Sequence, residues 1–354
     1  SGGKRAMRKR ARIIYNPTSG REMIKQHLVE ILAVFEKAGY ETSAFATTPE
    51  PNSAKNEAHR AAKDGFDLVV AAGGDGTINE VVNGIAPLHR RPKLAIIPAG
   101  TTNDYARALR IPREDPVAAA KVVLQNQRMK MDIGKAGDNY FINIAAGGLL
   151  TELTYDVPSN LKSIFGYLAY IVKGAEMLPR VKPVEMDIEY DGEHFHGQAS
   201  MFFLALTNSI GGFEQIVPDA SLDDGKFTMI IVKSSSLPDL LHLMVKALNG
   251  KHVDDPRIIY RKARKVVVNP VNERVMVNLD GEYGGDAPMV FKNLKRHIDM
   301  FTNLDSVPVS EPEDDEYRQV EEQFVAEVQN LSQDDQEWLC TVTNYGWLLL
   351  IVMH

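Results

Sequence analysis

The stretch Leu68-Val69-Val70-Ala71-Ala72-Gly73-Gly74-Asp75-Gly76-Thr77 carries the strongest structural signal in this chain. Its first five residues are apolar, which is typical of a strand buried on both faces of a parallel sheet. The glycines that follow allow a sharp turn and let backbone N–H groups approach an anion without a Cβ in the way. A carboxylate beside a bound phosphate would repel it unless a cation lay between them. Asp75 therefore indicates a metal–nucleotide complex.

Two other strand ends resemble this one. Residues 11–15 run into Asn16-Pro17-Thr18-Ser19-Gly20, and residues 94–97 run into Pro98-Ala99-Gly100-Thr101-Thr102-Asn103-Asp104. Residues 78–84 are predicted to begin a helix whose N-terminus faces the same anion. Open α/β sheets bind ligands at the carboxyl ends of their strands, so the three segments together predict a nucleotide site. Taken alone, the glycine cluster is also compatible with a tight turn in which Asp75 caps the helix.

The apolar pattern divides the chain into two parts. From residue 8 to about residue 131, apolar runs alternate with helical stretches, among them residues 25–38 and 54–63. This alternation predicts a parallel sheet covered by helices. After residue 134 short β-rich runs follow one another, several of them separated by Asp-Gly turns. We therefore predict an open parallel α/β nucleotide-binding domain at the N-terminus and an antiparallel β-sandwich domain at the C-terminus.

The charge of the chain is unevenly placed. Residues 311–337 contain eleven acidic residues and one basic residue, so the net charge of −7 becomes +3 for the rest of the chain. A mildly basic body suits an anionic nucleotide and an anionic membrane surface, although a solvated surface without a partner has the same composition. The one cysteine, Cys340, excludes an internal disulfide framework and is typical of a reducing compartment.

The three glycine-bearing segments, in their order and spacing, resemble the diacylglycerol kinase catalytic domain, which is shared with sphingosine and ceramide kinases. The resemblance covers about residues 8–305 and is closest to the soluble diacylglycerol kinases of Gram-positive bacteria. Residues 15–20, 222–225 and 280–285 carry this closer similarity. It implies a discontinuous ATP-binding domain, residues 8–132 plus about 294–310, and a sandwich domain, residues 133–293. Outside them we expect a disordered acidic tail, residues 311–337, and an apolar extension, residues 338–354.

The resemblance implies an ATP-dependent kinase that phosphorylates diacylglycerol to phosphatidate and requires Mg²⁺. In this chain Asp75 would organise Mg-ATP and Glu282 would be the general base. From its residues alone, the Asp280-Gly281 pair before Glu282 favours a hairpin turn with a solvated glutamate, and the resemblance reverses this preference. The expected ATP contacts are Asn16, Pro17, Thr18, Ser19, Gly20, Thr47, Gly73, Gly74, Asp75, Gly76, Thr77, Ile78, Asn79 and Thr101.

The resemblance also implies a set of supporting residues. A structural Mg²⁺ would be held by the Asp224 carboxylate and by the backbone carbonyls of Ser221 and Lys226. Asp132 and Asp280 would join an acidic network around the site, and Lys173 would lie near phosphates or lipid headgroups. Arg21 stands where the close relatives carry lysine, and a guanidinium does not replace an ammonium group in every contact.

Other activities share parts of this pattern. The glycine loop is also similar to those of NAD kinases and phosphofructokinases, but the Asp280-Gly281-Glu282 segment argues against an NAD kinase. A kinase of another lipid, such as phosphatidylglycerol or a sphingoid base, would share all the motifs. A non-catalytic nucleotide-binding regulator is disfavoured because both Asp75 and Glu282 are present.

The expected partners follow from the substrate. Diacylglycerol lies in a membrane, so the resemblance implies a cytoplasmic protein that associates peripherally with the inner face of the cell membrane. We expect no nucleic-acid partner, and the family suggests a homodimer.

Overall fold

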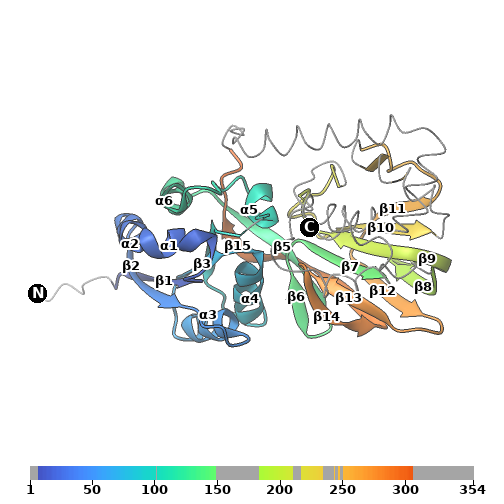
Figure 1. Ribbon diagram of the computed structural model, residues 1–354, viewed down its shortest axis with the longest axis horizontal. Coiled ribbons are helices and arrows are strands. Elements are labelled where there is room, and N and C mark those ends of the chain that lie inside the picture. The colour runs from blue at the N-terminus through green and yellow to red at the C-terminus, as the bar shows by residue number, and fades with distance from the viewer. Residues whose placement is uncertain are drawn as a thin grey trace, which may run out of the picture. The chain divides into compact units, whose positions relative to one another are not determined.

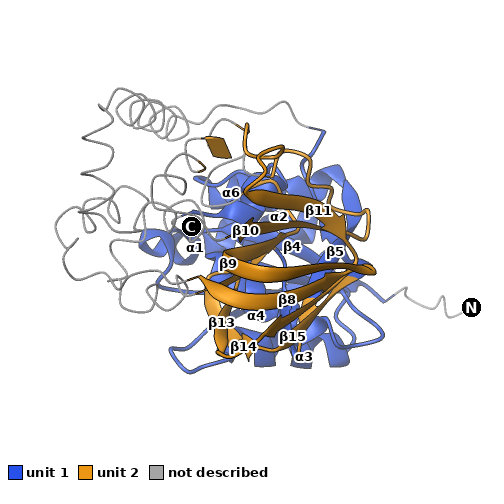
Figure 2. Ribbon diagram, turned by 90° about the vertical axis from the view of Figure 1, so that its right-hand side faces the viewer, with its two compact units in different colours: residues 1–134, 138–142, 294–306 blue, residues 135–137, 143–293, 307–354 orange. Residues whose placement is uncertain are grey.

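The computed structural model describes residues 7–100, 102–148, 183–209, 217–233, 243, 246–247 and 250–305. The chain forms two compact units, which Figure 2 shows in different colours. Unit 1 comprises residues 1–134, 138–142 and 294–306, and unit 2 comprises residues 135–137, 143–293 and 307–354. The acidic tail and the apolar extension predicted from the sequence lie outside the described residues.

Unit 1 is built on a parallel sheet with the strand order β2-β1-β3-β4-β15. β3 is buried over its whole length, as the unbroken apolar run predicted. β5 pairs with β15 and with the short strand β6. The bounds are β1 Lys9–Tyr15, β2 Tyr40–Ala46, β3 Leu68–Gly73, β4 Lys93–Pro98, β5 Arg128–Ala136, β6 Asn139–Phe141 and β15 Met289–Phe301.

Helices cover both faces of this sheet (Figure 1). α2 packs with α6 on one face, and α3 packs with α4 on the other. The α3–α4 contact is close because Gly84 lies on it: a Cβ there would be 2.3 Å from the Lys55 carbonyl oxygen. The bounds are η1 Gly20–Glu22, α1 Met23–Gln26, α2 Leu28–Lys37, α3 Ser53–Lys63, α4 Asp75–Ile85, α5 Asp104–Ala108, α6 Pro116–Lys121 and η2 Val122–Gln125. The single helix predicted over residues 25–38 is interrupted at His27, whose backbone is not helical.

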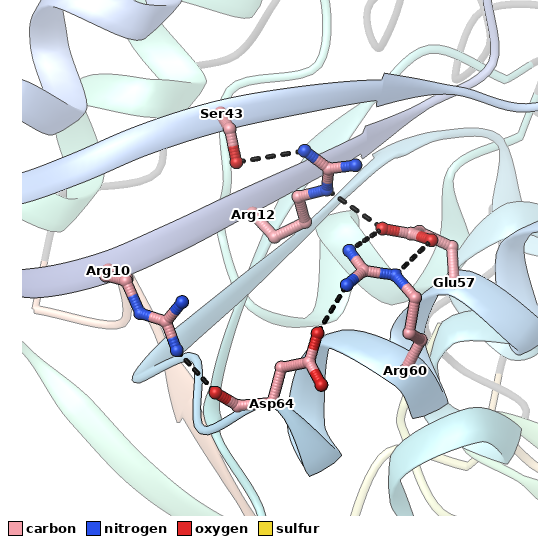
Figure 3. A network of polar contacts seen from close by, with 6 residues as sticks. All are labelled: Arg10, Arg12, Ser43, Glu57, Arg60 and Asp64. Atoms are coloured by element: carbon pink, nitrogen blue, oxygen red, sulfur yellow. Dashed lines mark hydrogen bonds and ion pairs between the residues drawn. The ribbon is translucent and has the colours of Figure 1, made fainter.

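A polar network joins β1 and β2 to α3 (Figure 3). Glu57 accepts hydrogen bonds from Arg12 Nε at 2.9 Å and from Arg60 Nη2 at 2.6 Å, and Arg12 Nη1 donates to Ser43 Oγ at 3.0 Å. Burial by itself would raise the pKa of Glu57, but the hydrogen bonds from Arg60 and Arg12 outweigh it and lower the pKa. The network stabilises the position of α3 on the sheet, because a buried carboxylate is tolerated only where it is paired.

The strands described for unit 2 pair antiparallel throughout, which confirms the antiparallel fold predicted for the C-terminal part. The long strand β9 pairs with β8 along its first half and with β7 and β10 along its second half, so it joins two branches of the sheet. The bounds are β7 Ile144–Gly148, β8 Val184–Tyr190, β9 Glu193–Ala205, β10 Phe227–Lys233, β11 Ile258–Ala263, β12 Lys265–Pro270, β13 Val275–Leu279 and β14 Glu282–Ala287.

In the part of the chain that the structure describes, every helix is too short or too polar to cross a membrane.

We expect unit 1 to lose stability in mild acid through His297. Its Nε2 bonds to the carbonyl of Ala86, the C-cap of α4, at 2.7 Å. Burial lowers the pKa of His297, and the charge of Arg91 lowers it further, against the raising effect of the Ala86 hydrogen bond. The folded protein therefore binds this proton less readily than the unfolded chain. The contribution of neutral His297 to the stability of unit 1 is present in full above about pH 6.5. It is lost as the pH falls from there through the lower pKa of the folded state.

Thermal melting between pH 8 and pH 5 checks this expectation. The melting temperature of His297→Gln should fall less steeply with acid than that of the wild type, whereas His89→Gln, at an exposed position of unit 1, should keep the wild-type slope. Equal slopes for the wild type and His297→Gln would contradict it.

Candidate functional site

Three loops at the carboxyl ends of β1, β3 and β4 lie side by side in unit 1. Hydrogen bonds of the sheet continue beyond the strands: Asn16 N–H donates to the Ala72 carbonyl at 2.9 Å, and Ala99 N–H donates to the Gly73 carbonyl at 2.8 Å. The chain leaves β1 for β2 on one side and reaches β3 on the other, so β1 and β3 flank a topological switch point. Open α/β sheets bind their ligands at such a point.

Glycines allow the three loops to approach one another. A Cβ on Gly100 would be 2.7 Å from the Gly74 Cα, and a Cβ on Gly20 would be 3.0 Å from the Ala99 Cβ. Gly20 also has a φ of 57°, which favours glycine. The sequence predicted glycines for contact with an anion, and the structure adds that they are needed for loop-to-loop packing.

The first loop is shaped by its own side chains. Asn16 Oδ1 accepts hydrogen bonds from Thr18 N at 3.0 Å and Thr18 Oγ1 at 2.9 Å. Thr47, which follows β2, joins this edge because its N–H donates to the Tyr15 carbonyl at 2.9 Å. Arg21 is exposed next to the loop, with a φ of 54°. The structure thus places the predicted residues 16–20 and Thr47 at the switch-point edge.

Asp75 opens α4 and contacts the third loop. Its Oδ2 accepts hydrogen bonds from Thr102 Oγ1 and from Asp104 N–H, each at 3.2 Å. Its Oδ1 is buried and has no hydrogen-bond partner among the described residues. Burial raises the pKa of Asp75, although the hydrogen bonds from the third loop and the charge of Arg107 oppose the shift. A buried carboxylate oxygen without a donor fits a divalent cation, which would compensate the cost of burying the charge.

The remaining predicted contacts on α4 differ in their surroundings. Gly76 is exposed and faces open space, whereas the Ile78 side chain is fully buried in the core. Asn79 Nδ2 donates to the Tyr140 carbonyl of β6 at 3.2 Å, and Asn83 pairs with both backbone groups of Tyr140. The amides of Asn79 and Asn83 therefore attach α4 to β6. Thr101 lies outside the described residues.

In unit 2, Glu282 follows a tight hairpin turn. Leu279 pairs with Glu282, and the two residues between them, Asp280 and Gly281, have φ values of 51° and 88°. Positive φ at both positions is the signature of a type I′ turn. Glu282 is exposed at the first position of β14, and within the described ranges no hydrogen bond or ion pair engages its carboxylate. This geometry leaves the carboxylate available to accept a proton.

Asp280 anchors this turn to β7. Its Oδ1 accepts hydrogen bonds from Asn143 N at 2.8 Å and Ile144 N at 3.0 Å, and its own N–H donates to the Ile144 carbonyl at 2.8 Å. The structure thus gives Asp280 a positioning contact next to Glu282.

Two further supporting residues were predicted, Asp132 and Lys173. Asp132, in unit 1, is 2% exposed, and its Oδ1 accepts a hydrogen bond from Arg296 N at 2.8 Å, where β15 has a φ of 51°. The carboxylate therefore stabilises a kink in β15. Lys173 lies outside the described residues.

The predicted cation loop, residues 218–226, which includes Ser221, Asp224 and Lys226, is contacted by a lysine that the sequence did not indicate. Asp224 Oδ1 accepts a hydrogen bond from Lys226 N at 3.0 Å, and Asp224 Oδ2 pairs with Lys262 Nζ at 3.1 Å. Lys262 Nζ also donates to the Asp219 carbonyl at 3.0 Å. Carboxylate and carbonyl oxygens are the donors that Mg²⁺ prefers, so the loop fits this ion chemically, but the ammonium group competes for the same oxygens.

Among the described residues, no three histidine, cysteine or acidic side chains are grouped closely enough to hold a metal ion. His194 and His196 lie exposed on β9 and contact Asp187 and Glu185 of β8, at 3.5 Å and 3.2 Å. Their place on an exposed strand face accounts for this pair. A cation at Asp75 or Asp224 would therefore need ligands from elsewhere, such as nucleotide phosphates, backbone carbonyls or water.

Sequence reasoning missed several residues of the site. Thr102 and Asp104 belong to the predicted turn 98–104, but nothing in their spacing indicated that both would donate to Asp75. The contact of Lys262 with Asp224 joins residues 38 positions apart and leaves no local signal.

Comparisons with known proteins agree with this architecture. Residues 10–136 match the model of the diacylglycerol kinase catalytic domain, and residues 154–302 match the YegS C-terminal NAD kinase beta sandwich-like domain. The chain is 57% identical to a diacylglycerol kinase of Bacillus subtilis over 290 residues, 82% of this chain and 95% of that protein. It is 54% identical to a diacylglycerol kinase of Staphylococcus aureus over 301 residues, 85% of this chain and 95% of that protein.

A solved structure from Bacillus anthracis, provisionally named a diacylglycerol kinase, has the same fold. It superimposes with a TM-score of 0.73 at 27% sequence identity, over 87% of this chain and 100% of the other.

Proposed function

This chain belongs to the diacylglycerol kinase family, and we propose that it transfers the terminal phosphoryl group of Mg-ATP to the free hydroxyl of diacylglycerol, giving phosphatidate. ATP is the co-substrate. The observation that supports the nucleotide role most directly is the Asp75 carboxylate, with one oxygen bonded by the third loop and the other buried without a partner. Phosphoryl transfer depends on positioned phosphates and on compensation of the charge that develops on them.

Three groups of residues in this chain are assigned to phosphate binding, cation binding and proton transfer. We assign the binding of the ATP phosphates to the backbone N–H groups and hydroxyls of residues 16–20, 47, 73–79 and 101. Asp75 would hold the cation of Mg-ATP, and that cation would neutralise phosphate charge when it is bound. Glu282 accepts the proton of the lipid hydroxyl, so that the oxygen attacks the phosphorus as the bond to ADP breaks.

The supporting residues position other groups or bind charged groups in this proposal. Asp280 orients the turn before Glu282, and Asp132 holds the backbone of β15 at Arg296. Asp224, with the carbonyls of Ser221 and Lys226, would hold a structural Mg²⁺ after Lys262 turns aside. Arg21 and Lys173 would contact phosphates or lipid headgroups.

The substrate requires contact with a membrane surface. We infer peripheral association with the inner face of the cell membrane, driven by the mildly basic body of the chain. We also propose that the chain forms a homodimer. Nucleic acid is not among the partners that we propose.

A lipid panel tests the function. The protein is incubated with radiolabelled ATP and mixed micelles of diacylglycerol, phosphatidylglycerol or sphingosine, and separately with NAD and no lipid. We expect label in phosphatidate with the diacylglycerol micelles and little elsewhere. Label found only in another lipid, or only in the product formed from NAD, would show that diacylglycerol is not the substrate.

A further inference from the structure

The third loop of unit 1 is closed by one side chain. Asn103 Oδ1 accepts a hydrogen bond from Gly100 N–H at 2.8 Å, and Asn103 Nδ2 donates to the Gly100 carbonyl at 2.8 Å. Asn103 is 6% exposed, so these bonds are largely shielded from water. An asparagine amide carries both an acceptor and donors, and the loop uses both kinds.

The backbone of Asn103 is left-handed, with φ 50° and ψ 43°. Asparagine and glycine adopt this conformation more readily than other residues, so the backbone alone would accept either. The paired contact with Gly100 is therefore a separate property, which glycine would not supply.

This closed loop determines what Asp75 contacts. The residues on both sides of Asn103 donate to Asp75 Oδ2: Thr102 through its hydroxyl and Asp104 through its N–H. Gly100, the other end of the closure, packs against Gly74, the residue before Asp75. Both ends of the closure thus meet the Asp75 segment, and Asp75 Oδ1 stays buried and unpartnered within the described residues.

We propose that Asn103 is a positioning residue for phosphoryl transfer: its amide closes the third loop so that Thr102 and Asp104 engage one oxygen of Asp75 and leave the other for the cation of Mg-ATP. The inference rests on the proposed role of Asp75. Without the amide, the loop loses two hydrogen bonds and the donors shift relative to the carboxylate. A displacement of about 1 Å at a reacting group reduces the rate by up to about a hundredfold.

Asn103→Gly isolates the amide, because glycine keeps the left-handed backbone and removes only the side-chain contacts. Asn126→Gly is the matched control: Asn126 is also left-handed, with a φ of 53°, belongs to unit 1, and is exposed at the end of η2. Asn103→Asp is the second variant, since it keeps the size and an acceptor and loses the donor to the Gly100 carbonyl.

Three experiments are carried out for each variant. The folded fraction comes from circular dichroism, kcat and KM come from diacylglycerol micelles, and the affinity for AMP-PNP with and without Mg²⁺ comes from isothermal titration. We expect Asn103→Gly and Asn103→Asp to lower kcat per folded molecule about 10- to 100-fold and to weaken binding of AMP-PNP more with Mg²⁺ than without it. Asn126→Gly should match the wild type in all three.

The outcomes separate the two proposals. Wild-type kcat and Mg²⁺-dependent affinity per folded molecule in both Asn103 variants would overturn the positioning role. An equal loss of affinity with and without Mg²⁺ would also overturn it, because the loop would then bind nucleotide without acting through Asp75. A wild-type protein that phosphorylates no lipid would instead refute the proposed function itself.

Discussion

Replacing Glu282 by glutamine should leave a folded protein whose turnover is about a hundred to ten thousand times slower than that of the wild type. The substitution removes a proton acceptor and retains nearly the same shape. Glu282 is exposed, and the described residues offer its carboxylate no hydrogen bond or ion pair, so its charge contributes little to stability. We expect the change in melting temperature to be no larger than the change that an ordinary surface substitution causes.

The measurement is kcat with diacylglycerol micelles at saturating Mg-ATP. Glu273→Gln is the matched control, because Glu273 is also an exposed glutamate of unit 2, lies in the turn before β13 at the other end of that strand, and should give wild-type turnover. Normal turnover in Glu282→Gln would remove this residue as the base while leaving the nucleotide site unaffected.

Asp75→Asn should reduce kcat/KM for Mg-ATP by about a hundred- to a thousandfold. The amide oxygen can still accept the hydrogen bonds from Thr102 and Asp104, so the loop contacts persist. What is lost is the negative charge on the buried oxygen that we assign to the cation. Because burial disfavours that charge, its removal should not lower the melting temperature by more than a few degrees.

Steady-state kinetics over a range of Mg²⁺ concentrations, together with thermal melting, check this prediction. Asp138→Asn, at an exposed turn of unit 1, provides the control and should match the wild type. Retained activity with an unchanged Mg²⁺ requirement would exclude Asp75 as the residue that organises Mg-ATP.

These two predictions depend on features that local sequence patterns indicate. The strand β3 and the turn after it follow from a local pattern, an unbroken apolar run followed by glycines, and the structure reproduces both. The hairpin before Glu282 likewise follows from its Asp-Gly pair, which forms the predicted tight turn. The break at His27 within a predicted helix shows the limit of such patterns, because the apolar spacing continues across it.

Other features arise only when distant segments pack together. Asn79 and Asn83 bind the Tyr140 backbone about sixty positions away, and Lys262 contacts Asp224 across 38 positions. Neither contact has a sequence signature, because either partner could equally well bond to water on an isolated element.

The amino-acid order therefore specified where strands end, which turns are tight and which residue types gather at the strand ends. These properties depend on the conformational limits of glycine and on apolar periodicity within a few residues. The folded arrangement specified which oxygen of Asp75 is bonded and which is not, and that Asn103 closes the loop that bonds it. Hydrogen-bond partners of buried groups are chosen by the packing of whole elements, so they are determined only in three dimensions.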